Sequence, residues 1–399
     1  MKTNNLIDRL IIRSFKSIVD QEIALGHVNV FIGANGSGKS NILEALGVLS
    51  AAASGRVDDE SLQRRGVRPG VPRLYKSTFK QRRRSPEILF AAHAPQASYA
   101  VSLLNPLDDP QPAWRYKTEN LQIGSEKVVS RGPKTKGIHS EQGLAALKLV
   151  ELVEAHAARH LITLLREYRI YTPNTFMLRG LMQDPQTHPP VGLSGGGLAE
   201  AMKELQVLAG QNDFVDGALD DVVEMIDWIR DFDTTDRPGN ILSATVPRTR
   251  LTLRFRDRFM REDSNTLTAY DASEGALYIL FCAALALSPK TPQSIAIDNL
   301  DQVLNPRLAR KLARSLCHWF IANPEPRQLL FTAHNPSVLD GLPLQDDRVR
   351  LFTVDRNSKG YTQVRRIVIT DELRQLSEEK GWPLSRLWVM GHLGGVPNV

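Results

Sequence analysis

Residues 33–40 read Gly-Ala-Asn-Gly-Ser-Gly-Lys-Ser, the spacing of a loop that holds the phosphates of a nucleotide. Their glycines permit a tight turn with backbone N–H groups pointing inward, where anions bind. The Lys39 ammonium is placed to reach the β- and γ-phosphates, and the Ser40 hydroxyl can coordinate Mg²⁺. The residues expected to contact the nucleotide are Gly33, Asn35, Gly36, Ser37, Gly38, Lys39, Ser40 and Asn41.

An accidental glycine-rich turn is the alternative, but the flanking residues favour a phosphate loop. Residues 27–32 form an apolar run typical of a short buried strand, and residues 41–46 have the apolar face of a helix start. A strand before the loop and a helix after it are the context that the motif requires. The N-terminus of that helix would add its positive dipole end to the site.

Two other apolar strands end in side chains that could complete the site. Asp298 follows the run 294–297 and can hold a Mg²⁺-bound water opposite the phosphate loop. His334 follows the run 329–333, where it could contact the γ-phosphate. A lone histidine at a strand end is usually structural, and the matching position of this one favours a functional role.

These residues need strands and helices in a definite order to bring them together. Before residue 140 the segments expected to be strands are 6–15, 21–25, 28–32, 87–92, 98–104 and 113–123. The last three are separated by proline-rich turns and predict an antiparallel meander. The helix after the phosphate loop should extend to about residue 52, and residues 124–137 are expected to form a mobile loop.

From residue 141 to residue 165 apolar side chains recur at helical spacing, which predicts one long amphipathic helix. The further helices expected are 198–208, 219–229, 275–287, 306–321 and 373–379. The chain should return to strands after residue 238, among them 294–297, 328–332 and a hairpin of 348–355 and 361–368.

The expected fold is therefore α/β, with three parts. Residues 1–140 form an N-terminal lobe with the phosphate loop and the meander, and residues 141–240 form a helical insertion. Residues 241–399 form a C-terminal lobe that contains Asp298 and His334.

The composition is that of an ordinary globular protein. Of the 399 residues, 42% are hydrophobic and 24% are charged, enough for one large domain with an insertion or for two domains. The only two cysteines, Cys282 and Cys317, lack metal-binding spacing, and the longest apolar run, 276–287, is too short to span a bilayer. Together with an N-terminus that lacks a signal-peptide core, these features favour a cytoplasmic protein without membrane contact.

A formal net charge of +6 permits contact with nucleic acid but does not demand it. The basic residues are concentrated at 80–84 and 248–258. In the second cluster, apolar residues at 251, 253 and 255 alternate with polar ones, so a strand there would bury one face and present a basic stripe on the other. A solvated edge strand protected by its charge is the alternative, and it is the commoner case.

The order of these motifs resembles the ABC-type ATPase heads of the SMC, RecF and OLD-like group. The matching motifs are residues 11–17 (Ile-Ile-Arg-Ser-Phe-Lys-Ser), the loop 33–41, Ser273-Glu274-Gly275, Asp298 and residues 332–336 (Thr-Ala-His-Asn-Pro). The resemblance covers nearly the whole chain. It implies a P-loop NTPase fold with ATP and Mg²⁺ as cofactors, the ion being held by Ser40 and Asp298.

In heads of this type two subunits enclose two nucleotides. The resemblance implies that Ser273 and Gly275 contact ATP held by the other subunit, so that ATP binding produces a homodimer. Asn305 and Pro306 would lie in the loop that crosses the interface. Residues 193–196, which match the transporter signature in letters only, lie too early in the chain and are expected to form a turn. No heptad run is visible, so a coiled-coil arm is not expected.

One position departs from the family pattern. Members usually carry glutamate directly after the strand-end aspartate, whereas Asn299 follows Asp298 here. An amide cannot accept the proton of the attacking water, and loss of a general base costs about 10²- to 10⁴-fold in rate. Hydrolysis should therefore be slow unless Asp301 reaches the water, and a mere surface carboxylate is the alternative for Asp301. The catalytic candidates are Asp298, Asn299, Asp301 and His334.

Three classes of function remain open at this stage. The first is an ATPase in DNA repair or phage defence that controls a separately encoded effector protein. The second is a dimer in which nucleotide binding itself gives the signal and turnover is incidental. The third is a nucleotide-gated clamp with DNA as its partner. The segment after His334 lacks a Glu-Gly-x-x-Asp pattern, so a nuclease is not expected.

Overall fold

The computed structural model describes residues 6–132, 139–149, 151–152, 156–237, 241–242, 245–246 and 249–393. Its centre is a six-stranded sheet, called here the central sheet, in the order β15-β14-β3-β13-β12-β8. Its strands are β3 (Val28–Ile32), β8 (Arg169–Tyr171), β12 (Ser294–Ile297), β13 (Gln328–Ala333), β14 (Val349–Arg356) and β15 (Thr362–Ile367). All neighbours run parallel except β15, which pairs antiparallel with β14. The inner strands are buried along their whole length, as parallel strands covered on both faces are.

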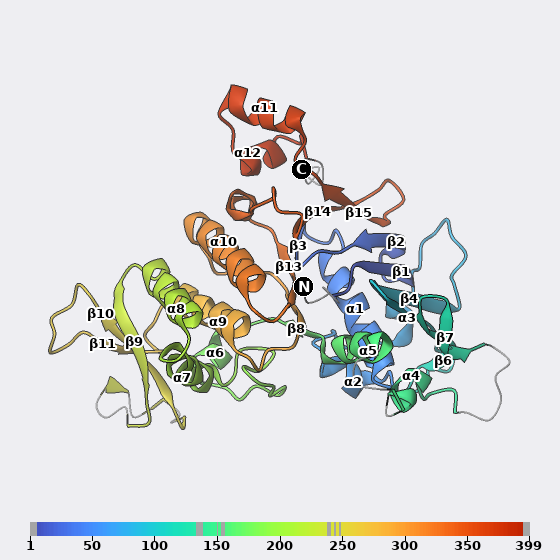
Figure 1. Cartoon of the computed structure of the whole chain (residues 1–399), viewed down its shortest axis with the longest axis horizontal. Coiled ribbons are helices and arrows are strands. Elements are labelled where there is room, and N and C mark those ends of the chain that lie inside the picture. The colour runs from blue at the N-terminus through green and yellow to red at the C-terminus, as the bar shows by residue number, and fades with distance from the viewer. Residues whose placement is uncertain are drawn as a thin grey trace.

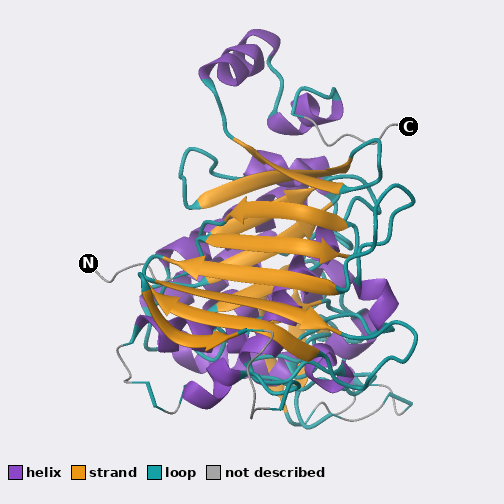
Figure 2. Cartoon of the chain, turned by 90° about the vertical axis from the view of Figure 1, so that its right-hand side faces the viewer, coloured by secondary structure: helices purple, strands orange, loops and turns teal. Residues whose placement is uncertain are grey.

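A second six-stranded sheet is antiparallel throughout and follows the order β2-β1-β4-β5-β6-β7 (Figure 2). Its strands are β1 (Arg9–Phe15), β2 (Ile18–Ala24), β4 (Glu87–Ala94), β5 (Ala97–Leu104), β6 (Arg115–Ile123) and β7 (Glu126–Arg131). The predicted meander is therefore confirmed, and β7 extends it by one strand.

Helix α1 (Lys39–Ala53) lies between the two sheets (Figure 1). It contacts β1 and β4 of the second sheet and β8 and β13 of the central sheet, and nearly all of its residues are buried. A helix that is apolar on all sides requires such a position. Because α1 starts at the last residues of the phosphate loop, this packing fixes the loop as well.

The opposite face of the central sheet is covered by helices α9 (Glu274–Leu287) and α10 (Pro306–Ala322). Helices α7 (Leu198–Ala209) and α8 (Asp213–Met225) pack against α9. A three-stranded sheet, β11-β10-β9, lies at the far end of these helices (Figure 1). Its strands are β9 (Ile229–Thr235), β10 (Thr252–Asp257) and β11 (Thr266–Thr268).

Shorter helices connect these layers. They are α2 (Asp59–Gln63), α3 (Pro72–Tyr75), α4 (Leu144–Lys148), α5 (Ala157–Glu167), α6 (Thr175–Leu178), the 3₁₀ helix η2 (Pro336–Gly341), α11 (Asp371–Lys380) and α12 (Leu384–Val389). None of the helices in the described part of the chain is both long enough and apolar enough to span a bilayer.

The prediction of one long helix over residues 141–165 was wrong. Helices α4 and α5 are separated by non-helical residues at 151, 152 and 156, while 150 and 153–155 lie outside the described residues. The two halves pack against partly different partners. The buried Glu119 carboxylate of β6 accepts the N–H groups of Leu144 (2.7 Å) and Ala145 (3.0 Å), which fixes α4 on the second sheet. Helix α5 packs on α1 and also on β5 and β6 of that sheet.

Two further segments differ from the predictions. The loop expected at 124–137 contains β7, and residues 133–138 lie outside the described residues. The helix expected at 219–229 ends at Met225, and β9 begins at Ile229, before residues 238–239, which also lie outside the described part. The division of the chain at residues 140 and 240 stays a proposal, in which the middle part also contributes β8 to the central sheet.

The basic strand predicted near residues 250–256 exists as β10, with Leu253 and Phe255 buried and Arg254 and Arg256 on the other face. The alternative, an edge strand, was wrong. Strand β10 is the centre of its sheet rather than an edge. Arg254 donates two hydrogen bonds to Asp233 (2.7 and 2.6 Å), and Arg256 donates one to Asp231 (2.5 Å). The aspartates of β9 therefore neutralise the stripe. Arg248 lies outside the described residues.

Candidate nucleotide-binding site

The phosphate loop joins β3 to α1 at the carboxyl edge of the central sheet. Gly36 and Gly38 have φ angles of 74° and 112°, in the left-handed region that favours glycine. A Cβ atom at Gly38 would lie 2.2 Å from Thr362 Oγ1, and one at Gly33 would lie 2.0 Å from the Val354 carbonyl oxygen. Gly33 is therefore required by the packing around the loop, Gly36 by its positive φ, and Gly38 by both.

Lys39 is the first residue of α1, and its side chain lies buried within the loop. Its ammonium donates hydrogen bonds to the carbonyl oxygens of Gly33 (2.8 Å) and Ala34 (2.9 Å) and lies 3.2 Å from His334 Nδ1. Burial lowers the pKa of Lys39 to about 8, although nearby carboxylates oppose that shift. Ser37 is also buried, and its Oγ has no hydrogen-bond partner in the described structure. A cation and an unpaired hydroxyl thus face the space that the loop encloses, which fits an anionic ligand.

Ser40 and Asp298 meet at the same edge of the sheet although 258 positions separate them. Ser40 Oγ donates to Asp298 Oδ1 (3.1 Å), and Thr332 Oγ1 donates to the same oxygen (2.6 Å). The Asp298 N–H donates to the Tyr171 carbonyl oxygen at the end of β8 (2.9 Å). Asp298 is therefore fixed from both neighbouring strands, its carboxylate by Thr332 and its backbone by Tyr171.

This pair fits magnesium better than a metal ion held by protein alone. Mg²⁺ takes oxygen ligands and is usually held by one or two protein groups together with water and substrate phosphates. Ser40 and Asp298 supply one hydroxyl and one carboxylate. Over the residues that the structure describes, no group of three or more His, Cys, Asp or Glu side chains could hold a metal. The donor set thus matches an ion that arrives with a nucleotide.

His334 has one defined tautomer in this arrangement. The Lys39 ammonium can only donate, so His334 Nδ1 accepts, and the ring proton lies on Nε2. Nε2 is 3.0 Å from Asn299 Oδ1, to which it donates. Burial and the Lys39 charge lower the pKa of His334. The histidine is therefore held neutral between a cation and an amide oxygen.

Asn299 occupies a restrained backbone position. Its φ of 58° lies in the left-handed region, which asparagine tolerates better than most residues. Its N–H donates to Thr332 Oγ1 (2.8 Å), and its carbonyl oxygen accepts from the Tyr278 hydroxyl (3.1 Å). The position directly after Asp298 thus holds an amide whose backbone groups and side-chain oxygen are hydrogen bonded.

The interpretation of Asp301 as a mere surface carboxylate was wrong, because the residue is only 7% exposed. Its Oδ2 accepts the backbone N–H groups of His334 (2.8 Å) and Asn335, so it fixes the loop that carries the histidine. Its Oδ1 is buried without a hydrogen-bond partner in the described structure. A cavity of about 430 Å³ lies here, lined by Asn299, Asp301, Gln302, His334 and Asn335.

Sequence reasoning missed a charged cluster on the other side of the loop. Glu44 of α1 is 2% exposed and forms ion pairs with Lys16 and Arg68. A cavity of about 520 Å³ opens beside this cluster, and the residues that line it include Lys16, Ser17, Asn41, Arg68, Arg73, Phe79 and Arg356. A buried glutamate in an apolar helix was the signal in the sequence, because such a residue is rarely buried unless it is paired.

Hydrogen bonds also fix the loop against the two sheets. Asn41 Nδ2 donates to Ser17 Oγ (2.7 Å), which lies 2.7 Å from Thr362 Oγ1. Thr362 in turn donates to the Ser37 carbonyl oxygen (2.7 Å). The turn between β1 and β2 and the start of β15 therefore hold the loop together, while Asn35 stays exposed at its tip.

Ser273 and Gly275 lie at the start of α9, where the Ser273 hydroxyl caps the helix by accepting the Ala276 N–H (3.3 Å). Ser273 is exposed, and neither of the two cavities beside the phosphate loop is lined by it or by Gly275. The structure thus brings together every other predicted site residue of the sheet edge and leaves these two apart from them.

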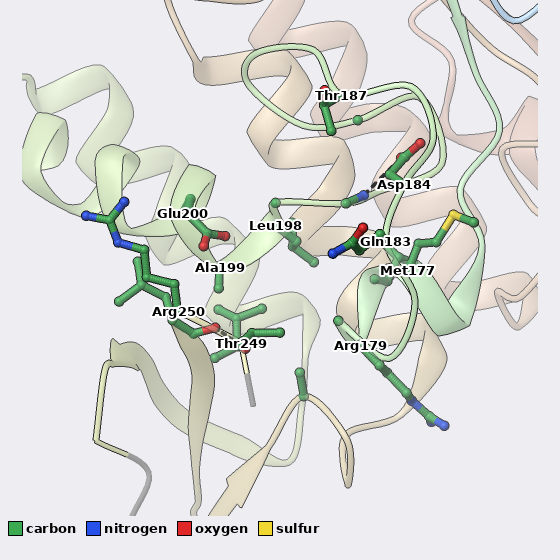
Figure 3. Close-up of a pocket in the computed structure, with 18 of the residues that line it drawn as sticks. Met177, Arg179, Gln183, Asp184, Thr187, Leu198, Ala199, Glu200, Thr249 and Arg250 are labelled. Carbon is green, nitrogen blue, oxygen red and sulfur yellow. Dashed lines mark hydrogen bonds between the residues drawn. The ribbon is translucent and has the colours of Figure 1, made fainter. Parts of the chain in front are cut away.

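A larger cavity, of about 840 Å³, lies away from this chemistry, between the segment 177–200 and the start of β10 (Figure 3). Gly196, the last residue of the turn at 193–196, lines it. As predicted, this segment is only a turn: the Asp184 carboxylate accepts the N–H groups of Ser194 (2.8 Å) and Gly196 (3.2 Å). The phosphate loop and Asp298 do not line this cavity.

The contacts of His334 lead to a prediction for solution NMR. With selective ¹⁵N-histidine labelling, His334 should be the neutral Nε2–H tautomer at pH 7, with a pKa below the ordinary 6.5. Asn299→Asp should raise that pKa, because a carboxylate stabilises the imidazolium. Since the unfolded chain takes up this proton first, the contribution of His334 to stability should fall as pH drops below about 6.5. The His334→Gln variant identifies the resonance, and an Nδ1–H tautomer would contradict the assigned contacts.

Comparison with protein families agrees with this geometry. The family described as "AAA domain, putative AbiEii toxin, Type IV TA system" matches residues 28–134 and 209–340, more than half of the chain. Two curated relatives are named DNA replication and repair protein RecF. The protein of Magnetococcus marinus is 41% identical over 64 residues, 16% of this chain, and that of Halothermothrix orenii is 38% identical over 71 residues, 17% of this chain. The matches span 17% and 19% of those relatives, less than a fifth of their length.

Solved structures show the same fold. An SMC head bound to the C-terminal winged-helix domain of ScpA has a TM-score of 0.53 at 12% identity and covers 91% of this chain and 98% of its own. An SMC head with an extended coiled coil, bound to the C-terminal domain of ScpA from Pyrococcus furiosus, has a TM-score of 0.52 at 12% identity, covering 94% and 99%. The chain therefore belongs to this AAA-domain family and has the fold of an SMC/RecF-like ABC-type ATPase head.

Proposed function

We propose that this protein binds MgATP, dimerises around it, hydrolyses it slowly and thereby controls a separately encoded effector. The observation that carries the proposal is the contact of Ser40 with Asp298 beside Lys39 and His334. These four side chains supply the hydroxyl, carboxylate, cation and imidazole that a nucleoside triphosphate with its metal ion requires.

The triphosphate would lie along the phosphate loop. Lys39 would contact the β- and γ-phosphates, and the unpaired Ser37 hydroxyl is free to donate to them. His334 lies beyond Lys39 and would reach the γ-phosphate. The nucleoside would then extend past Asn41 into the 520 Å³ cavity, whose walls include Asn41 itself. Ser40 and Asp298 would hold Mg²⁺, and the ion would supply charge neutralisation on the β- and γ-phosphates.

Turnover would be slow because few groups near the γ-phosphate can accept the proton of the attacking water. Asn299 cannot accept a proton, and its amide oxygen is already bonded to His334. Among the residues that line the 430 Å³ cavity, Asp301 is the one carboxylate, and its Oδ1 is unpartnered. We assign the proton of the attacking water to that oxygen. The other oxygen, Oδ2, already accepts two backbone N–H groups, so only Oδ1 remains for this role.

Dimerisation is proposed from the position of Ser273. Its hydroxyl and the N-terminus of α9 are exposed and lie apart from the cavities of their own phosphate loop. Helix N-termini attract phosphate groups. A second subunit placed head to tail would bring Ser273 and Gly275 to the γ-phosphate of the first, as the resemblance to SMC and RecF heads implies.

The biological setting is inferred from the relatives. Two of them are named for DNA replication and repair, and the matching family is named for a toxin–antitoxin system. The two SMC heads are in complex with ScpA, a separate protein. We therefore propose a role in DNA repair or phage defence, with an effector as a second protein. A nucleotide-gated DNA clamp with little turnover is the second candidate, and the amide at Asn299 favours it.

Variants at Lys39 and Asp298 should separate ATP binding from ATP hydrolysis. Lys39→Ala should abolish ATP binding, because it removes the cation within the phosphate loop. Asp298→Ala should leave binding measurable but remove Mg²⁺-dependent hydrolysis. Lys290→Ala, which removes an exposed lysine paired with Glu204, is the matched control and should behave like the wild type. Unchanged ATP affinity in Lys39→Ala, measured by calorimetry, would show that the site is misplaced.

A substitution at Ser273 tests whether ATP binding produces a dimer. With a slowly hydrolysed ATP analogue the wild type should double in mass by light scattering, and Ser273→Arg should stay monomeric with ATP affinity retained. Ser264→Arg places the same charge at an exposed loop residue and should still dimerise. A wild type that is monomeric both with and without the analogue would rule out a shared site.

Asp301→Asn tests the proposed base without disturbing the loop. The amide oxygen can still accept the N–H groups of His334 and Asn335, but it cannot take a proton. Single-turnover hydrolysis should therefore fall by about 10²- to 10⁴-fold, while ATP affinity stays the same. Wild-type hydrolysis in Asp301→Asn, combined with faster hydrolysis in Asn299→Glu, would instead place the missing base at position 299.

A further inference from the structure

The two basic clusters of the sequence differ in whether acidic residues neutralise them in the fold. The arginines of β10 are paired with the aspartates of β9 and are neutralised. The cluster at residues 80–84 is not. It joins other cations into one exposed set, called here the basic surface: Arg73, Lys80, Arg82, Arg83, Arg84, Arg356 and Lys359.

Two segments distant in sequence build the basic surface. The Phe79 ring packs edge-on against the Tyr361 ring, with centroids 4.6 Å apart, and so joins the loop after α3 to the turn between β14 and β15. The first segment is also anchored to the β1–β2 turn, because the Ser77 hydroxyl donates to the Ile18 carbonyl oxygen (2.9 Å). The two segments that carry the cations are therefore held beside each other.

The charge of the basic surface has no counterpart within the described part of the chain. None of its seven side chains forms an ion pair there, and segments 69–86 and 356–366 contain no Asp or Glu. Seven unpaired cations exceed the formal net charge of +6 of the whole chain. Like charges gathered on one surface repel each other, so a polyanionic ligand would stabilise this arrangement.

The residue types indicate which polyanion. Five of the seven cations are arginine, whose planar fork binds phosphate oxygens with two hydrogen bonds. A membrane-bound surface would combine the charges with a long amphipathic helix. Here the only helix, α3, has four residues, and Val71 and Leu74 are the exposed large apolar side chains beside it. We propose that the basic surface binds the phosphodiester backbone of nucleic acid, independently of base sequence.

The basic surface adjoins the proposed nucleotide site and shares Arg73 and Arg356 with the 520 Å³ cavity proposed for the nucleoside. The arginines at 82–84 do not line that cavity, and Lys39 is not part of the basic surface. Lys39→Ala should therefore lose ATP binding and keep full affinity for nucleic acid in the absence of nucleotide. Failure of the ATPase proposal would leave this inference standing, and the reverse also holds.

The test uses the full chain and a fluorescein-labelled 30-base-pair DNA duplex of mixed sequence. Fluorescence anisotropy is measured without nucleotide between 50 and 200 mM salt. The triple variant Arg82→Ala, Arg83→Ala, Arg84→Ala should lower affinity at least tenfold. Each lost phosphate contact reduces the slope of log affinity against log salt by about 0.9, so the slope should fall by about 2 to 3.

A matched control removes the same charge from another face. Arg307, Arg310 and Arg314 are exposed on α10, beside the acidic residues of α8, and Glu224 of α8 pairs with Lys311 of α10. Replacing these three arginines with alanine should keep affinity within twofold of the wild type. Equal losses of DNA affinity in both triple variants would show that affinity depends only on net charge, and would overturn the proposal.

Two other outcomes would also overturn it. One is a wild type that binds neither the duplex nor single-stranded DNA or RNA of the same length at 50 mM salt. The other is wild-type binding to vesicles containing 30% phosphatidylserine, lost in the Arg82, Arg83, Arg84 variant, without binding to any of these nucleic acids. The second result would assign the basic surface to a membrane.

Discussion

The candidate site depends on one constraint, that neighbouring parallel strands end at the same edge of a sheet. β3 leads to Lys39 and Ser40, β12 leads to Asp298, and β13 contains Thr332 and leads to His334. Segments far apart in the sequence are thereby held at hydrogen-bond distances from one another. Such preorganisation lowers the entropy cost of binding. A ligand at this edge would contact residues at the ends of three strands at once.

The nucleotide side of the site could be predicted from the sequence because its requirements are local. Gly36 and Gly38 are needed for positive φ, and Lys39 and Ser40 stand at fixed offsets from them. Asp298 could be found because an apolar strand ends in a carboxylate. The fold class followed from the same signals, and the strands of the central sheet match the predicted runs closely except β8, which was not predicted.

What the sequence could not predict depends on contacts between distant segments. Asp301 fixes the histidine loop through backbone N–H groups, and such bonds leave no pattern of residue types. The arginines of β10 read as a basic stripe because the aspartates that neutralise them lie on β9, a strand that was not predicted. The long helix failed as a prediction because α4 and α5 dock separately although their periodicity is continuous: α4 packs on β6 and β7, and α5 on β5, β6 and α1.

The most direct test of the central claim is a crystal structure with Mn²⁺ and a non-hydrolysable ATP analogue, with the metal located by anomalous scattering. The account predicts a manganese peak between Ser40 Oγ and the Asp298 carboxylate, with the triphosphate along residues 33–41. Nucleotide density in the 840 Å³ cavity beside residues 177–200, or a metal distant from Ser40 and Asp298, would contradict it.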